Sequence, residues 1–381
     1  MASNAKNLAE LLNTDSTVAV ADVADGSITT AKLASGAVTT VKIADDAVTS
    51  AKAVNSGRRN LIINGAMQVA QRGNSATGIG IAVGYNTVDR WRFADINNPT
   101  ARFTETQSTD APEGFGFSRK FEVTTNDGSV DDNEMQYTDH FIEALNLQLL
   151  KYGTSNAESL TLSFYVKSSV ASTMGVRITH EDGGGSYGAS YTINATNTWE
   201  RKTITVPGNT ATAINNDTGR GLRVAFGLNI GADNAGSNST AWGNGSLFGA
   251  HTNTFVGTAN ATWQVTGVQL EVGSSTSDFE HLSFAEELAL CQRYYQQIAG
   301  AGAGTSTSGG QSASAHSIVN FPTYMRVAPS TITIGSTANT SNTASVGTAS
   351  VTAYSLRWTA NSSSSGRQYW FVQSTTLDAE L

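Results

Sequence analysis

Apolar residues recur along this chain in short runs, and loops rich in Gly, Ser and Asn separate the runs. Within each run they alternate with polar residues or form a brief continuous stretch, and both patterns are typical of β-strands. The pattern predicts strands at residues 160–166, 174–179, 199–206, 221–228 and 262–272. Because no long helices are interleaved with these strands, we expect an all-β sandwich.

Two segments have helical spacing instead, at residues 140–152 and 284–297. In the second, Phe284, Leu288, Cys291 and Tyr295 are four, three and four residues apart, which places them on one helix face. Residues 60–65 (NLIING) predict a short strand that runs into an Asn-Gly turn. Residues 300–311 predict a flexible or turn-rich link. A second, smaller β unit is expected beyond it, with strands at 315–321, 331–335, 351–358 and 368–373.

Residues 25–54 contain one ten-residue unit three times, reading DGSITTAKLA, SGAVTTVKIA and DDAVTSAKAV. Each unit has two apolar positions five residues apart, and a fainter copy precedes the three. Two apolar residues in ten are too few to enclose a core within one chain. They must therefore be buried against neighbours, and the natural neighbours are other copies of the chain. We therefore predict a self-associating stalk, whose main apolar positions are Ile28, Leu33, Val38, Ile43 and Val48.

Composition and charge narrow the range of partners. Charged residues make up 14% of the 381 residues, below the roughly 25% of ordinary soluble domains, and the net charge is −8. A nucleic-acid partner would require a basic surface, so we expect none. No run approaches the ~18 apolar residues of a membrane span, and the N-terminus has no secretion signal, so no membrane insertion is expected. The single Cys291 excludes disulfides within the chain.

Signals for an enzyme or a metal centre are weak. The five histidines are scattered without a pair at ligand spacing, so we predict no metal site. The acidic run at 131–134 suits Ca²⁺ by ligand type but lacks EF-hand spacing, and a solvated loop is the alternative. Glycoside cleavage needs two opposed carboxylates, for which Glu181, Asp182 and Glu271 are candidates, although Glu271 is interpreted as a structural acceptor. We predict a non-catalytic protein without a cofactor.

Four local motifs, in order along the chain, resemble virion fibre proteins of tailed bacteriophages. The first is the repeat itself, and the second is NLIINGAM at 60–67 with QRG at 71–73 and DRW at 89–91. The third is TGVQLEVG at 266–273 with FE at 279–280 and EELALCQRYY at 286–295. The fourth is FP at 321–322 with MRVAP at 325–329. The resemblance implies a homotrimeric fibre with a central jelly roll similar to carbohydrate-binding modules and a distal, host-facing β-domain.

This resemblance also suggests a division of the chain. We assign residues 1–24 to attachment to other virion proteins, 25–56 to the stalk and 57–283 to the jelly roll. Residues 284–299 are then a linking helix, and 300–381 a receptor-facing β-domain. The expected function is multivalent attachment of the virion to host cell-surface glycans, by a protein made in the host cytoplasm. Two alternatives remain: a head or decoration fibre without a receptor role, and a glycan-degrading tail spike.

Glycan binding needs an exposed aromatic face and a few amide or carboxylate partners. Trp242, in the polar segment STAWGN, is the first candidate, with Asn244 beside it. Tyr187, next to the glycines at 183–185, is the second. In the terminal unit, Trp358 and Trp370 are candidates for a receptor face. For all of these aromatic residues, packing in a core or in a subunit interface is the alternative.

Other conspicuous residues receive structural roles. Trp91, Trp199 and Trp263 are expected to pack in the core. Cys291 is expected to behave as a small buried apolar side chain. Arg72, near the start of the globular part, is expected to be solvated, with an interdomain contact as the alternative.

Overall fold

The structure is a computed structural model that describes residues 58–243, 245, 247–307, 314–335, 337–341, 343–362 and 366–381. The chain divides after Gly57 into two units, and the described residues belong to the second. The predicted attachment segment 1–24 and stalk 25–56 therefore lie outside the described residues. The same holds for the predicted stalk positions Ile28, Leu33, Val38, Ile43 and Val48.

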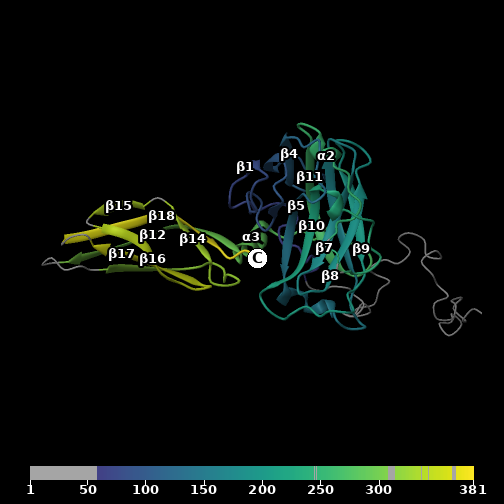
Figure 1. Ribbon diagram of the computed structural model, residues 1–381. Coiled ribbons are helices and arrows are strands. Elements are labelled where there is room, and N and C mark those ends of the chain that lie inside the picture. The colour runs from purple at the N-terminus through teal and green to yellow at the C-terminus, as the bar shows by residue number, and fades with distance from the viewer. Residues whose placement is uncertain are drawn as a thin grey trace, which may run out of the picture. The chain divides into compact units, whose positions relative to one another are not determined.

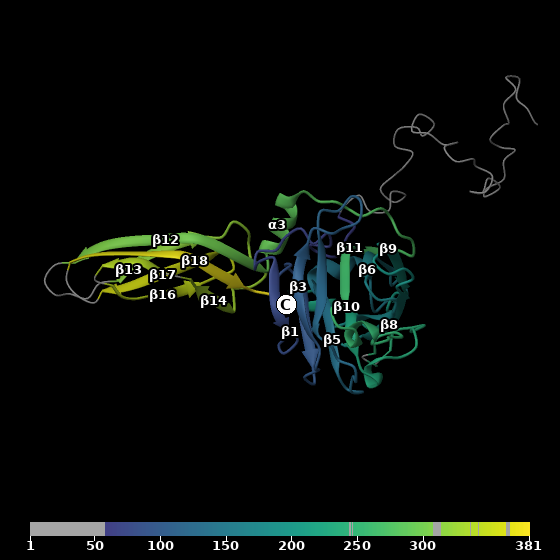
Figure 2. The same cartoon turned by 90° about the horizontal axis from the view of Figure 1, so that it is seen from above.

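Two antiparallel sheets form a β-sandwich between residues 75 and 272 (Figure 1). The six-stranded sheet has the order β1 (Ser75–Ile79), β3 (Arg102–Ser108), β4 (Ser118–Thr125), β11 (Thr262–Val272), β6 (Leu160–Ser168) and β9 (Glu200–Val206). The five-stranded sheet has the order β2 (Arg92–Ile96), β5 (Met135–Glu143), β10 (Arg220–Ile230), β7 (Thr173–His180) and β8 (Gly185–Thr192). Figure 2 shows the two layers, with β6, β9 and β11 on one side and β5, β8 and β10 on the other. The predicted all-β sandwich is confirmed at this level.

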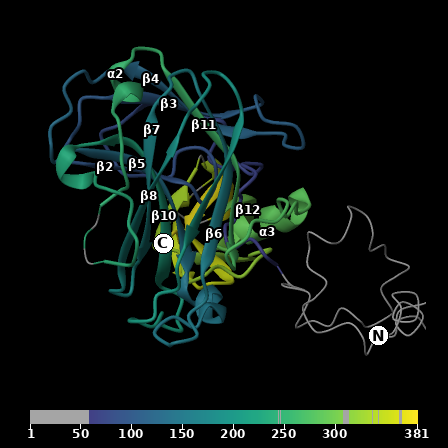
Figure 3. The ribbon, with the colours of Figure 1, turned by 90° about the vertical axis from the view of Figure 1, so that its right-hand side faces the viewer.

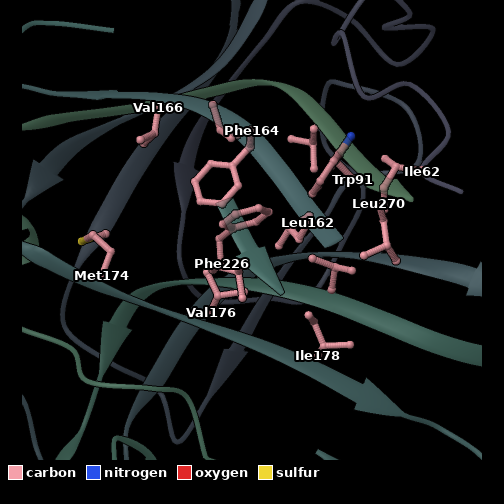
Figure 4. Close-up of a cluster of buried hydrophobic side chains, with 14 of the residues drawn as sticks. Ile62, Trp91, Leu162, Phe164, Val166, Met174, Val176, Ile178, Phe226 and Leu270 are labelled. Atoms are coloured by element: carbon pink, nitrogen blue, oxygen red, sulfur yellow. The ribbon is translucent and has the colours of Figure 1, made fainter. Parts of the chain in front are cut away.

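Side chains from the inner faces of both sheets fill the space between them (Figure 4). Phe164 of β6 and Phe226 of β10 meet edge to face with ring centroids 5.0 Å apart. Trp91 and Trp263 are fully buried in the same cluster, as predicted from the sequence. Each buried ring of this size contributes about 1.5–3 kcal/mol of transfer free energy, so this core stabilises the sheet that carries the site described below.

Among the described residues the helices are short, and both predicted helices differ from the structure. Residues 140–143 continue β5, and a 3₁₀ helix, η4 (Ala144–Leu150), follows. All nine residues of β5 are buried, so its apolar residues do not alternate and can be mistaken for a helix. The helix predicted at 284–297 is α3 (Phe284–Gln292), which begins with a capping box between Ser283 and Glu286 and ends before Tyr295. The remaining helices are η5 (Ala232–Asn234) and α2 (Thr254–Gly257).

The terminal part of the chain forms a second pair of sheets. One contains β12 (Tyr295–Thr307), β18 (Gly366–Asp378), β14 (Thr331–Ile334) and β15 (Thr337–Ser341). The other contains β13 (Ser314–Asn320), β17 (Ser355–Ser362) and β16 (Thr343–Val351). Figure 3 shows α3 beside the start of β12. Two predictions are corrected here. Residues 300–307 are not a flexible link but part of β12, paired with β18, and the strand predicted at 351–358 is interrupted by a turn between β16 and β17.

The second and third motifs of the fibre resemblance lie against each other. The Asn60 side chain donates to the carbonyl of Val268 and accepts from the amide of Leu270, both at 3.0 Å. A Cβ on Gly65 would lie 2.1 Å from the Val268 oxygen, so only glycine fits this approach. The strand predicted at 60–65 does not form, but the Asn-Gly turn predicted at its end is present. The segment is a turn with Asn64 at a φ of 58°, which ends extended pairing.

A buried ionic cluster joins the sandwich to the terminal segment; we call it the junction. Arg90, with no exposed surface, pairs with Glu380 and stacks on Tyr294 at 3.5 Å from the ring centroid. Arg72 lies 3.2 Å from Asp378 and 3.3 Å from Glu380. The expectation that Arg72 is solvated is corrected, because its side chain is only 9% exposed and these carboxylates hold it in place.

Candidate functional site

The outer face of the five-stranded sheet carries charged side chains on otherwise apolar strands. In β10, Leu222, Val224 and Phe226 enter the core, so Arg223 between them points to the opposite face. The pairing register places Phe141 of β5 on one side of Arg223 and Thr179 of β7 on the other. Alternation along three neighbouring strands thus gathers polar groups on one rigid surface.

These groups form a continuous chain of ion pairs, Arg92–Asp139–Arg223–Glu181. Arg92 donates to both carboxylate oxygens of the fully buried Asp139, from Nε at 3.0 Å and from Nη2 at 2.6 Å. Arg223 Nη1 lies 3.9 Å from the same carboxylate, and its Nε lies 2.9 Å from Glu181 Oε1. Burial alone would lower the pKa of Arg92, but the bonds to Asp139 prevail and raise it. The Arg92 guanidinium therefore stays charged and is fixed in orientation by its two bonds to Asp139.

Aromatic rings support the arginines from beneath. The Arg177 guanidinium carbon lies 4.6 Å from the centroid of the Phe248 ring and 5.4 Å from that of Tyr137. Arg92 and Arg220 both stack on Phe141, at 4.6 and 4.2 Å. Burial, together with the neighbouring Arg223 charge, lowers the pKa of Arg177. Cation–π contacts of this kind hold a guanidinium in position without neutralising it.

A cavity of about 290 Å³ opens beside these ion pairs, over the turn that joins β7 to β8. It is lined by Thr179, His180, Glu181, Gly183, Gly185, Ser186 and Arg223. His180 is only 2% exposed, and neither of its ring nitrogens has a hydrogen-bond partner among the described residues. Because burial lowers the pKa of His180, the ring is neutral at pH 7 and can both donate and accept. His180 has the same parity along β7 as the core residues Val176 and Ile178, so its ring faces the interior, with its centroid 5.9 Å from that of Tyr152.

The structure brings together two of the aromatic residues predicted for glycan binding. Trp242 is half-buried and donates its indole N–H to the carbonyl of Pro207 at 2.7 Å. Its ring centroid lies 6.3 Å from that of Tyr187 and 6.4 Å from that of His180. Trp242 and the half-buried Tyr187 both pack against the core of the sandwich, and their role in binding stays a prediction.

The other predicted glycan-binding residues are placed differently. Trp358 is 1% exposed and packs with Met325 and Leu356 in the core of the terminal unit, so its prediction as a receptor-face residue is corrected. Asn244 lies outside the described residues, and so does the side chain of Trp370. Trp199, expected in the core, is half-exposed and donates to Asp110 at 3.3 Å.

The candidate carboxylates for glycoside cleavage are engaged elsewhere. Glu181 is held by Arg223, and Asp182 accepts from the backbone and side chain of Asn215, at 3.0 and 2.7 Å. Glu271 lies in the other sheet and accepts from Ser277, as expected of a structural acceptor. No two of the three are opposed across one cleft. In the described part of the chain, no group of three or more His, Cys, Asp or Glu is placed to hold a metal ion. Its helices are also too short to cross a membrane.

The arginines and Asp139 of this face were not predicted from the sequence. A signal was present, because Arg223 in GLRVAFGL and Arg177 in MGVRIT each interrupt a strand that is otherwise apolar. A charge at such a position must face a partner or a ligand. The partners could not be found from the sequence, because Arg92 and Asp139 are 47 residues apart.

Comparisons with known proteins find similarity to solved structures alone, and it is distant. No family model and no curated protein sequence matches the chain. Among solved structures, the enzymatically active domain of tailspike protein 4 from bacteriophage CBA120 is 12% identical with a TM-score of 0.30, covering 56% of this chain and 21% of that one. The CBM22-1 xylan-binding domain from Paenibacillus barcinonensis is 10% identical with a TM-score of 0.28, covering 58% and 100%. A cyclase from Fischerella sp. is 10% identical with a TM-score of 0.31, covering 58% and 98%.

This chain thus spans about a fifth of the tailspike domain's length. At these TM-scores the similarity transfers no function to it. The site has to be interpreted from its own geometry.

Proposed function

We propose that this chain is a virion fibre protein of a tailed bacteriophage that attaches the particle to host cell-surface glycans without cleaving them. The proposed binding surface is the outer face of the five-stranded sheet, and the sandwich is a jelly roll used for carbohydrate binding. The observation that carries the proposal is the ion-pair chain Arg92–Asp139–Arg223–Glu181 beside an open cavity.

Sugar hydroxyls both donate and accept hydrogen bonds, and this face offers both kinds of partner. Glu181 accepts, Arg223 donates, and the Thr179 and Ser186 hydroxyls do either. All four line the cavity at or near strands of a packed sheet, where side chains are held more precisely than on long loops.

The engaged carboxylates favour binding over cleavage. A glycosidase needs one carboxyl group free to act as acid and a second opposite it. Glu181 and Asp182 are each held by a neighbour, and Glu271 belongs to the other sheet. We therefore propose attachment without cleavage and without a cofactor, and keep the glycan-degrading spike as the second candidate.

The repeat at 25–54 supports the oligomeric part of the proposal. Its apolar stripe needs other copies for burial, and we propose a homotrimer, with residues 1–24 bound to other virion proteins. Linked sites engage a surface as effectively intramolecular events, which raises avidity by roughly 10²–10⁴ over one site. Such a protein is made in the host cytoplasm and ends in the virion.

The test combines mass with binding. Light scattering of the full chain should give three times the mass of one chain, and a chain starting at Gly57 should lose that association. The full chain should bind members of a panel of bacterial surface polysaccharides, release no products, and lose binding on Arg223→Ala. Arg201→Ala, an exposed arginine on the other sheet, is the matched control and should bind normally. Absence of binding across the panel would favour a head or decoration fibre, and product release would favour a spike.

A further inference from the structure

We propose that the outer face of the five-stranded sheet selects anionic glycans, and that a carboxylate or phosphate group of the ligand binds at Arg223. This inference rests on the proposed function and specifies its ligand class. Its first support is the charge on the face. Four arginines, Arg92, Arg177, Arg220 and Arg223, share it with only two paired carboxylates, Asp139 and Glu181.

The nearby carboxylates do not remove this positive excess. Glu143 is bonded by Arg293 from Nε at 2.9 Å and from Nη2 at 2.6 Å, so that pair neutralises itself. Asp182, beside Glu181, is bonded to Asn215 and does not line the cavity. A local positive excess on a chain with a net charge of −8 attracts anions to this face.

The second support is the geometry of Arg223. Its Nε is held by Glu181, but its two terminal nitrogens make only long contacts. Nη1 is 3.4 Å from the Tyr137 hydroxyl and 3.9 Å from Asp139, and Nη2 is 3.5 Å from Thr179 Oγ1. A guanidinium bonds a carboxylate or phosphate best through two such N–H groups at 2.7–2.9 Å. Arg223 thus lines the cavity with two terminal nitrogens that make no short hydrogen bond among the described contacts, and Nη2 lies beside the cavity residue Thr179.

The third support is the wall around this position. The Thr179 and Ser186 hydroxyls line the same cavity, so the sugar that carries the anion also finds donors and acceptors. The volume of about 290 Å³ is close to the lower end of the roughly 300–1,000 Å³ typical of small-ligand sites. One anionic residue of a polymer would occupy it, and its neighbours would extend across the open sheet face.

The experiment uses the full chain and compares three polymers by calorimetry: polygalacturonate, a glycerol-phosphate teichoic acid, and neutral galactan. We expect at least one of the two anionic polymers to bind at least tenfold more tightly than galactan, and salt to weaken that binding. Which one binds more tightly identifies the anion. Arg223→Gln should lower anionic binding at least tenfold, and Arg223→Lys should restore only part of it because an ammonium lacks the paired donors.

Two further variants separate charge from folding. Arg220→Gln removes one exposed charge from the same face and should weaken anionic binding about two- to fivefold, while Arg201→Gln on the other sheet should not. The inference would be overturned if galactan bound as tightly as the anionic polymers and if Arg223→Gln weakened the binding of both. The proposed function would then still stand. Absence of binding to any polymer, with thermal unfolding unchanged, would overturn both.

Discussion

Removing Glu380 should open the junction, and the single cysteine reports the opening. Arg90 has no exposed surface, and the Glu380 side chain that pairs with it is 5% exposed. Burial alone would lower the pKa of Arg90, but Glu380 raises it, so the guanidinium remains charged. Glu380→Ala would leave that charge buried with one hydrogen bond, to the carbonyl of Phe141 at 2.7 Å. Breaking a buried pair from one side costs about 3–5 kcal/mol.

Cys291 is buried in the cluster that contains Phe141, Tyr294 and Leu381, next to the same ion pairs. Burial raises the pKa of its thiol well above the usual range, so it reacts with thiol reagents only when the junction opens. Since each 1.36 kcal/mol is a factor of ten, a loss of about 3–5 kcal/mol should speed labelling by about two to four orders of magnitude. The assay is the rate of thiol labelling in native buffer, normalised to the rate in denaturant.

Asp378→Asn is the matched control. Asp378 also pairs with Arg72, but its side chain is 35% exposed, and an exposed pair contributes at most about 1 kcal/mol. It should speed labelling by no more than about fivefold. If Glu380→Ala also stayed within fivefold of the unmodified chain, the reasoning that Arg90 depends on Glu380 would be refuted.

Three further predictions concern other parts of the same unit. Burial raises the pKa of Asp89 to about 6, although Arg72 opposes the shift. Between about pH 4 and 6 the folded chain therefore keeps the Asp89 proton, whereas the unfolded chain releases it. The stabilisation that the neutral Asp89 gives to the folded state is complete below about pH 4 and is lost as the pH rises through about 6. Asp89→Asn should remove roughly 2–3 kcal/mol of that pH dependence, measured as the difference between denaturant titrations of the two proteins from pH 4 to 7. Gly65→Ala should lower the free energy of unfolding by about 1–3 kcal/mol, because the alanine Cβ would overlap the Val268 carbonyl. An unchanged denaturation midpoint would contradict that packing. Trp242→Phe should cost about 1 kcal/mol in thermal unfolding, because Phe keeps the ring contacts but loses the bond to Pro207; an unchanged Tm would show that water replaces it.

Where the sequence pattern was regular, the elements followed from it. The strand predicted at 262–272 is β11 with the same bounds, because its apolar residues lie two apart on both sides of an irregularity between Thr266 and Gln269. β5 was missed because both of its faces are buried, and Asp139 and Glu143 are buried there as the partners of arginines. A pattern of apolar and polar letters cannot represent a charge that is buried because a distant residue neutralises it.

Residues 300–307 show a different limit of the sequence. Alternating Gly and Ala there favour a turn-rich link by composition, yet the segment pairs with β18 along its whole length. A strand with small side chains depends on its partner strand for stability, and the partner begins at Gly366. The candidate site was limited in the same way, because Trp242 and Tyr187 are visible as aromatic residues, whereas the arginine face depends on the register of three strands.

The junction also constrains the order of events during synthesis. Arg90 and Glu380 are 290 residues apart, and a ribosome adds roughly 5–20 residues per second, so roughly 15–60 s separate the two residues on a growing chain. During that interval the sandwich strands are already made and Arg72 can meet Asp89, but Arg90 has no Glu380 with which to pair. Arg90 therefore lacks its carboxylate partner until the segment after β18 arrives. Closure of the junction is therefore a late folding step of the described unit, and a pulse of thiol labelling on nascent chains would time it.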